Sequence, residues 1–364
     1  MKKESVIADQ LISNESIRPP DIRRVGLDPD FWYPVCLAKT LKKNKPVSLS
    51  YAGEPIVLVR TQSNTVFALE DRCAHRQIPL SVGEVKGETI QCSYHCWTYD
   101  KTGRCVNVPY LDKDKQLPTG VKSYPCREAY GFIFIFPGEP KKAELTSFPE
   151  IPAWGRKDYK TRYLNRQVNC HYSFMHENLM DMNHQFLHRK LMGSIRTVFL
   201  EKRKGNNWVE CDYTFARKSG RQHIGEKLIL RRIKRISHVN MEDKERDLMT
   251  ITTDYPYQRL TFTPRGATEP ALDLWNVYIP VDKAQRVNHT FGLMMFKRPS
   301  SLPWLMDLFW PLIIWFTEGI FAEDRWIVEL EQAAHDAQGE DWNQEIFPII
   351  QDLRKVLIEN GVKL

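Results

Sequence analysis

The sequence predicts an α+β protein, in which an all-β N-terminal unit precedes a larger unit of antiparallel strands and helices. From Leu27 to about Pro140, short runs of alternating apolar and polar residues are separated by glycine, proline and asparagine, as in strands joined by turns. Beyond Phe148, a helical pattern around residues 172–190 is followed by further strand-like runs. Separate runs of helix and strand favour the α+β class.

A chain of 364 residues with 42% hydrophobic residues is long enough for about two domains with substantial cores. We expect an extension at residues 1–27, the β unit at residues 28–147 and the larger unit at residues 148–364. The extension is polar and contains Pro19-Pro20. It lacks the apolar stretch of a secretory signal, so we expect a cytoplasmic protein whose eight cysteines form no disulfide framework.

The most informative segment of the β unit is CAHRQIPLSVGEVKGETIQCSYHCW, from Cys73 to Trp97. It contains a Cys-x-His pair, Cys73 and His75, and a Cys-x-x-His pair, Cys92 and His95. Two thiolates on one iron and two imidazoles on the other make the Rieske [2Fe–2S] arrangement. A zinc site uses the same ligand types, but zinc fingers pair Cys with Cys and His with His. The interleaved order favours the Rieske cluster.

A second group of ligand-type residues lies in HENLMDMNHQFLH, at residues 176–188. At 3.6 residues per turn, the spacing of this segment places four side chains on one helical stripe: Glu177, Asp181, His184 and His188. Two imidazoles one turn apart and a carboxylate make a facial triad, which binds iron(II) and leaves positions open for dioxygen. An isolated pattern of this kind is more often a polar helix surface. The neighbouring Rieske motif favours iron.

Both segments resemble those of the large (alpha) subunit of the Rieske non-haem iron oxygenases. The first resembles the C-x-H-R-x-x-x-L-S-x-G and Q-C-x-Y-H-G-W loops of this family, and the second its E-N-x-x-D-x-x-H-x(3–4)-H signature. The resemblance implies a Rieske domain followed by a helix-grip catalytic domain. One position departs from the family pattern, because Cys96 stands where the family usually has glycine. We interpret its thiol as a small filler rather than a ligand.

By the same resemblance, His184 and His188 bind the iron. Asp181 matches the family's bridging aspartate, which hydrogen-bonds the cluster histidine of a neighbouring subunit, here His95. For Glu177, the motif's outer position, helix capping or solvation is an equal alternative.

The third iron ligand is expected far downstream. The segment FAEDRWIVELEQ, residues 321–332, looks like the family's late F-x-E-D-x-x-x-x-E segment, whose aspartate completes the triad. The resemblance makes Asp324 the expected ligand and Glu323 the runner-up.

The resemblance implies one Rieske cluster and one mononuclear Fe(II) per chain, with O₂ as co-substrate. We therefore expect a terminal oxygenase that hydroxylates or oxidatively demethylates a small aromatic or alicyclic substrate, in a homotrimer. The sequence contains no G-x-G-x-x-G pattern for a nicotinamide or flavin. NAD(P)H should therefore act only indirectly, through a separate reductase, with or without a ferredoxin. The alternative is a Rieske-type electron carrier or binding protein without oxygenase activity.

The net charge of +7 is spread along the chain, with its densest patch in RRIKR at residues 231–235, and predicts no nucleic-acid partner. Residues 301–321 are strongly apolar, but their uninterrupted core at 308–316 is too short to span a bilayer. We expect a buried helix that leads into Asp324. A hydrophobic substrate channel or a peripheral membrane contact is the alternative.

Overall fold

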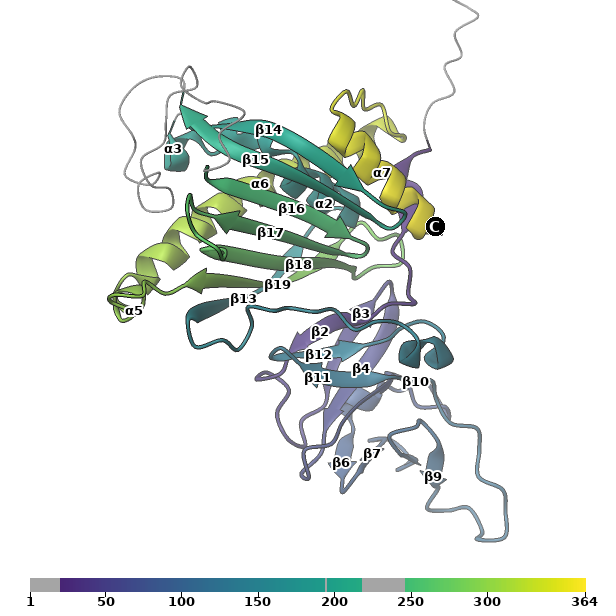
Figure 1. Cartoon of the computed structure of the whole chain (residues 1–364). Coiled ribbons are helices and arrows are strands. Elements are labelled where there is room, and N and C mark those ends of the chain that lie inside the picture. The colour runs from purple at the N-terminus through teal and green to yellow at the C-terminus, as the bar shows by residue number, and fades with distance from the viewer. Residues whose placement is uncertain (1–19, 194, 218–245) are drawn as a thin grey trace, which may run out of the picture.

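A computed structural model describes residues 20–193, 195–217 and 246–364, so the basic patch at 231–235 lies outside the described residues. A small all-β unit lies at one end of the molecule, and a larger unit of one sheet and several helices at the other (Figure 1). The α+β class and the order of the two units are as the sequence predicts.

The small unit contains three antiparallel sheets. Two of them form its body, in the orders β10-β5-β4-β3 and β11-β12-β2. Their strands are β2 (Tyr33–Leu37), β3 (Val47–Tyr51), β4 (Glu54–Arg60), β5 (Val66–Glu70), β10 (Ser123–Tyr124), β11 (Cys126–Ala129) and β12 (Phe132–Ile135). The third sheet follows chain order and consists of β6 (Glu84–Lys86), β7 (Thr89–Gln91), β8 (Thr98–Tyr99) and β9 (Cys105–Asn107). It lies at the end farthest from the larger unit (Figure 1).

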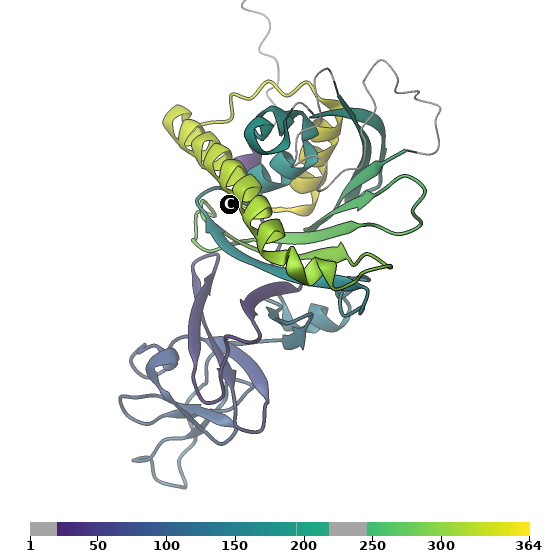
Figure 2. The ribbon, with the colours of Figure 1, turned by 90° about the vertical axis from the view of Figure 1, so that its left-hand side faces the viewer.

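The larger unit is built on a seven-stranded antiparallel sheet with the order β13-β19-β18-β17-β16-β15-β14. Its strands are β13 (Tyr159–Val168), β14 (Ile195–Lys204), β15 (Trp208–Arg217), β16 (Leu248–Asp254), β17 (Tyr257–Thr263), β18 (Leu272–Pro280) and β19 (Asn288–Lys297). Three helices cover one face of this sheet: α2 (Tyr172–Met180), α6 (Trp310–Gln338) and α7 (Pro348–Asn360) (Figures 1 and 2). This is the helix-grip arrangement.

The segment 172–190 is not one helix, contrary to the helical stripe that we expected. α2 ends at Met180, a 3₁₀ turn η4 covers Met182–Phe186, and a short helix α3 covers Arg189–Met192. Asp181 separates α2 from η4, with φ −88° and ψ 89°, and its side chain accepts a hydrogen bond from the Asn183 backbone N–H. Aspartate competes for backbone N–H groups in this way, so it favours helix ends over helix interiors.

The last residues of the expected extension pack against the larger unit. β1 (Val25–Gly26) pairs with β20 (Val362–Lys363), which follows α7. Arg23, in the 3₁₀ turn η1 (Ile22–Arg24), is 6% exposed and donates a hydrogen bond to Glu177 on α2. The N-terminal and C-terminal ends of the described chain therefore meet beside α2. The domain boundaries at 27 and 147 remain a prediction.

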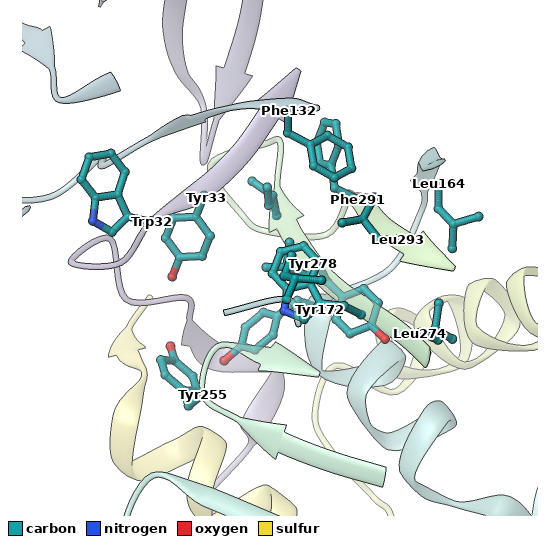
Figure 3. Packing of buried hydrophobic residues seen from close by; sticks show 14 of the residues in the cluster. Trp32, Tyr33, Phe132, Leu164, Tyr172, Tyr255, Leu274, Tyr278, Phe291 and Leu293 are labelled. Carbon is teal, nitrogen blue, oxygen red and sulfur yellow. The ribbon is translucent and has the colours of Figure 1, made fainter. Parts of the chain in front are cut away.

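The two units share a continuous apolar core. The ring of Phe132 contacts Tyr163 and Phe291 of the larger unit, with ring centroids 5.4 and 5.7 Å apart (Figure 3 shows Phe132 and Phe291). The tip of the β3–β4 hairpin adds backbone hydrogen bonds, from Ala52 to Pro280 and from Gly53 to Val281. These contacts fix one unit against the other.

The apolar segment 301–321 is helical but not buried. It forms α5 (Leu305–Leu308) and the beginning of α6, yet Trp304, Leu308 and Trp315 are 57, 62 and 64% exposed in the single chain. The expectation of a buried helix is therefore wrong. No helix among the described residues is long and apolar enough to cross a membrane.

Candidate metal centres

Two loops next to the outermost small sheet bring together the four predicted cluster ligands. Cys73 and Cys92 are each 2% exposed, and the rings of His75 and His95 lie edge to face with centroids 4.5 Å apart. Burial is the main reason why the pKa of the Cys92 thiol is raised, and neighbouring Cys73 raises it further.

The donor set and its surroundings suit a Rieske cluster. His75 Nδ1 is buried and has no hydrogen-bond partner among the described residues, as expected for an atom that binds metal. The hydroxyl of Tyr99 lies 3.2 Å from Cys73 Sγ and accepts from the Ala74 N–H, which holds the first loop in place. Trp97 stacks on His75, with ring centroids 4.8 Å apart. Buried thiols beside two fixed imidazoles match the two-plus-two ligands of this cluster.

Cys96 occupies a left-handed backbone conformation, with φ 57°. An L-residue is strained there, whereas glycine is not, which explains why glycine suits this position. The side chain is exposed rather than packed as a filler, contrary to our interpretation. What distinguishes this residue is therefore its backbone conformation and not its side-chain packing.

The second metal centre gathers His184, His188 and Asp324. One ligand-type atom from each lies within 4.8 Å of the others. His188 Nε2 is 3.1 Å and His184 Nε2 is 3.6 Å from Asp324 Oδ1. His188 Nε2 and Asp324 Oδ1 are both buried and lack a hydrogen-bond partner among the described residues. Converging atoms without partners are what a bound ion requires, so these residues fit a mononuclear iron.

The remaining ring nitrogens of both histidines are held by the protein. His188 Nδ1 donates to Glu323 Oε2 at 2.8 Å, and His184 Nδ1 donates to the Asp181 carbonyl. Such bonds fix the tautomer and leave Nε2 free for metal. Burial alone would lower the pKa of His188, but Asp324 and Glu323 together raise it. Glu323 thus fixes the ring of His188 through Nδ1, while Asp324 lies on the Nε2 side of the same ring.

Asp181 is half-buried beside this centre. Its Oδ1 accepts from the backbone N–H and the side-chain amide of Asn183, both at 2.8 Å. Within the described part of the chain, its Oδ2 has no hydrogen bond. The cluster-bearing sheet β6–β9 lies at the opposite end of the molecule from α2 and α6, so Asp181 and His95 of one chain do not meet (Figure 1).

Sequence reasoning missed a largely buried ion-pair network around Glu177, in which Arg23 is buried and Glu177, Asp341 and Arg354 are half-buried. Arg23 and Arg354 contact its two carboxylate oxygens at 2.6 and 2.5 Å, and Asp341 lies 3.5 Å from Arg354. Burial would raise the pKa of Glu177, but the two arginines outweigh burial and lower it. Glu177 therefore anchors α2 to both ends of the chain. No local pattern connects residues so distant in sequence.

Comparison with known proteins gives consistent matches. Residues 31–125 match the family model of the Rieske [2Fe-2S] domain, and residues 168–348 match the vanillate O-demethylase oxygenase C-terminal domain. Together the two matches take in well over half of the chain, each inside one of the two predicted units.

Among curated proteins, the chain is 29% identical to the 4β-methylsterol monooxygenase of Methylococcus capsulatus, over 94% of this chain and 90% of that protein. It is 33% identical to the oxygenase component of dicamba O-demethylase from Stenotrophomonas maltophilia, over 43% of this chain and 47% of that protein. Among solved structures, dicamba monooxygenase bound to dicamba has a TM-score of 0.72 at 22% identity, and the match covers 92% of this chain and 97% of that one. This last similarity concerns the fold.

Proposed function

Since the chain belongs to the Rieske non-haem iron oxygenases and is a terminal oxygenase, we propose that it oxidises a methyl group of an apolar polycyclic alcohol of the methylsterol class. One observation carries this choice of substrate: the similarity to 4β-methylsterol monooxygenase extends over 94% of this chain. The match to dicamba O-demethylase covers 43% of it. Similarity that extends across nearly the whole chain bears more on the substrate than similarity that covers less than half of it.

We propose that Cys73, Cys92, His75 and His95 bind the [2Fe–2S] cluster, and that His184, His188 and Asp324 bind Fe(II). The cluster supplies single electrons, and the iron supplies dioxygen activation. The chain's own contribution at the iron site is positional: it holds Nδ1 of His184 and of His188, which leaves Nε2 of both rings toward Asp324, and it buries His188 Nε2 and Asp324 Oδ1.

We further propose that the active form is a homotrimer in which Asp181 of one chain accepts a hydrogen bond from His95 of the next. The distance between the two sites within one chain favours this arrangement (Figure 1). Both sites also expose aromatic residues: Tyr94 and Tyr110 beside His95 are 56 and 61% exposed, and Trp326, two residues after Asp324, is 57% exposed. Exposed aromatic side chains are enriched at protein interfaces.

Oxygenases of this family receive electrons from a separate reductase, often through a ferredoxin. We propose the same donors for this chain, and a cytoplasmic location. The proposed function is tested with purified protein, a surrogate reductase and ¹⁸O₂, using 4-methylsterols and methoxylated aromatic acids as substrates. Oxidation of the sterol methyl group with incorporation of ¹⁸O is expected. Turnover of methoxylated acids alone would contradict the substrate class and favour O-demethylation.

A further inference from the structure

Two buried side chains between α2 and the sheet carry polar atoms without hydrogen-bond partners. His176 on α2 is 0% exposed, and neither of its ring nitrogens has a partner among the described residues. Asn276 on β18 is 3% exposed, and its Oδ1 is also unpartnered. Buried polar groups are nearly always hydrogen-bonded, so two such groups in one region indicate a missing polar ligand.

Both side chains flank Tyr278. The ring of His176 lies edge to face with Tyr278, with centroids 4.9 Å apart, and Asn276 precedes Tyr278 by two residues on the same face of β18 (Figure 3 shows Tyr278). Tyr278 donates to Gln258 Oε1 at 2.8 Å, and Gln258 Nε2 donates to the His176 carbonyl at 2.9 Å. These bonds fix Tyr278 and Gln258 against α2. They leave the ring nitrogens of His176 and Oδ1 of Asn276 without a hydrogen-bond partner among the described residues.

This pair lies close to the iron centre. Phe174 on α2 and Val328 on α6, four residues after Asp324, lie in one buried cluster, so the part of α2 that carries His176 packs beside the helix that carries Asp324. His176 is on α2, and the 3₁₀ turn η4 that carries His184 follows α2 after Asp181. The unpartnered atoms are therefore on the sheet side of the proposed iron site.

The sheet face next to Asn276 is apolar. Met294 is paired with Arg162, whose side chain donates to Thr317 on α6, so this face points toward the helices. Because side chains alternate between the two faces of a strand, a row of apolar side chains lies on this same face of β17, β18 and β19. Each of them is at most 8% exposed: Leu260, Phe262, Leu274 and Met294. The surroundings suit a molecule that is apolar except for one polar group.

That polar group should be uncharged. Burial lowers the pKa of His176 to about 3, so its ring is neutral and offers one donor and one acceptor. Two arginines on the same sheet face, Arg162 and Arg166, are already paired with Glu318. A hydroxyl matches what remains, because it can donate to Asn276 Oδ1 and accept from the His176 N–H. A ketone or an ether has no proton to donate to Asn276.

We propose that His176 and Asn276 form a subsite that binds the single hydroxyl group of an otherwise apolar substrate. This inference rests on the proposed function and names the substrate group that the site recognises. Neither residue is a proposed metal ligand, so the subsite is testable by binding alone, without turnover.

The test measures binding of lanosterol, its 3-keto form and its 3-O-methyl ether to the iron-loaded oxygenase without reductase, by quenching of tryptophan fluorescence. The variants are Asn276→Leu and His176→Phe. Thr290→Val is the matched control, because Thr290 faces the same side of the sheet opposite Tyr278 and already donates to Asn288.

We expect the natural chain to bind the alcohol roughly tenfold or more tightly than the ether, since the ether leaves a buried acceptor unpaired. Asn276→Leu should lose this preference while it binds the ether as well as the natural chain does, which also shows that the variant is folded. Thr290→Val should keep the preference. An unchanged preference in both subsite variants would overturn the subsite alone. Failure of the natural chain to bind any of the three sterols would overturn the substrate class and the subsite together.

Discussion

Glu323 and His188 are joined by a hydrogen bond of 2.8 Å to the Nδ1 of the imidazole, while the Nε2 of the same ring faces Asp324 at 3.1 Å. Adjacent carboxylates on α6 therefore contact opposite nitrogens of one histidine. This geometry distinguishes the two carboxylates, of which the family resemblance made Asp324 the expected iron ligand and Glu323 the runner-up. It supports Asp324 as the iron ligand and Glu323 as the residue that orients His188.

Replacement of these two carboxylates should have different effects on iron content. Asp324→Ala removes a proposed ligand, so iron should fall from about three to about two per chain, and substrate oxidation should be lost. Glu323→Gln keeps a hydrogen-bond acceptor for His188, so iron should remain but bind about 10- to 100-fold more weakly. Iron analysis together with the electron paramagnetic resonance signal of the reduced cluster measures both effects. If Glu323→Gln lost the iron and Asp324→Ala kept it, the assignment would be reversed.

Asp181→Asn tests the proposed path between subunits. The new amide oxygen can still accept the bonds from Asn183, so both metal centres and the trimer should persist. Turnover should fall about 10- to 100-fold, because a neutral amide holds the incoming imidazole less well than a carboxylate does. Steady-state oxidation rates, iron content and sedimentation of the same preparation check the three expectations.

A mixing experiment is the control for the proposed electron transfer from the cluster of one subunit to the iron site of the next. His95→Ala chains lack a proposed cluster ligand, and Asp324→Ala chains lack a proposed iron ligand, so each is expected to be inactive alone. Assembled together, they should recover part of the activity, because an intact cluster then meets an intact iron site across an interface. A fully active monomer, or full activity in Asp181→Asn, would show that electrons do not pass between chains.

The sequence was most informative where the ligands are close together in the chain. Cys73, His75, Cys92 and His95 lie on two loops joined by a short hairpin, so their spacing alone indicated the cluster. Asp324 is far from His188 in sequence, and only the resemblance to a family pointed to it. Hydrophobic periodicity could not reveal the break at Asp181, because that break depends on a side-chain bond to Asn183. Nor could hydropathy show that Trp304 and Trp315 lack a covering element in the single chain.

Cys96→Gly should stabilise the Rieske unit. The residue has φ 57° and an exposed side chain, so glycine removes backbone strain without loss of packing. The expected gain is about 1 kcal/mol in the free energy of unfolding, measured by denaturant titration of the iron-loaded protein. Cys96→Ala is the matched control, since alanine removes the thiol but keeps the strain. An equal gain in both variants would assign the effect to the thiol.

The Glu177 network predicts a stability difference that depends on pH. The pKa of this carboxyl is lower in the folded chain than its ordinary value of 4.5, because Arg23 and Arg354 together outweigh the effect of burial. Its contribution to stability is therefore complete above that ordinary value and is lost as the pH falls through the folded pKa. Glu177→Gln leaves two arginines without their shared partner, so we expect a loss of about 3 kcal/mol at pH 7. The loss should shrink steadily below about pH 4.5, as urea titrations of both proteins between pH 7 and 3.5 would measure.

Glu359→Gln on α7 is the control, because its pair with Lys355 is exposed, and it should change the free energy of unfolding by less than about 0.5 kcal/mol. A Glu177→Gln deficit that stayed constant over this pH range would mean that side-chain shape, rather than charge, holds α2 to the two ends of the chain.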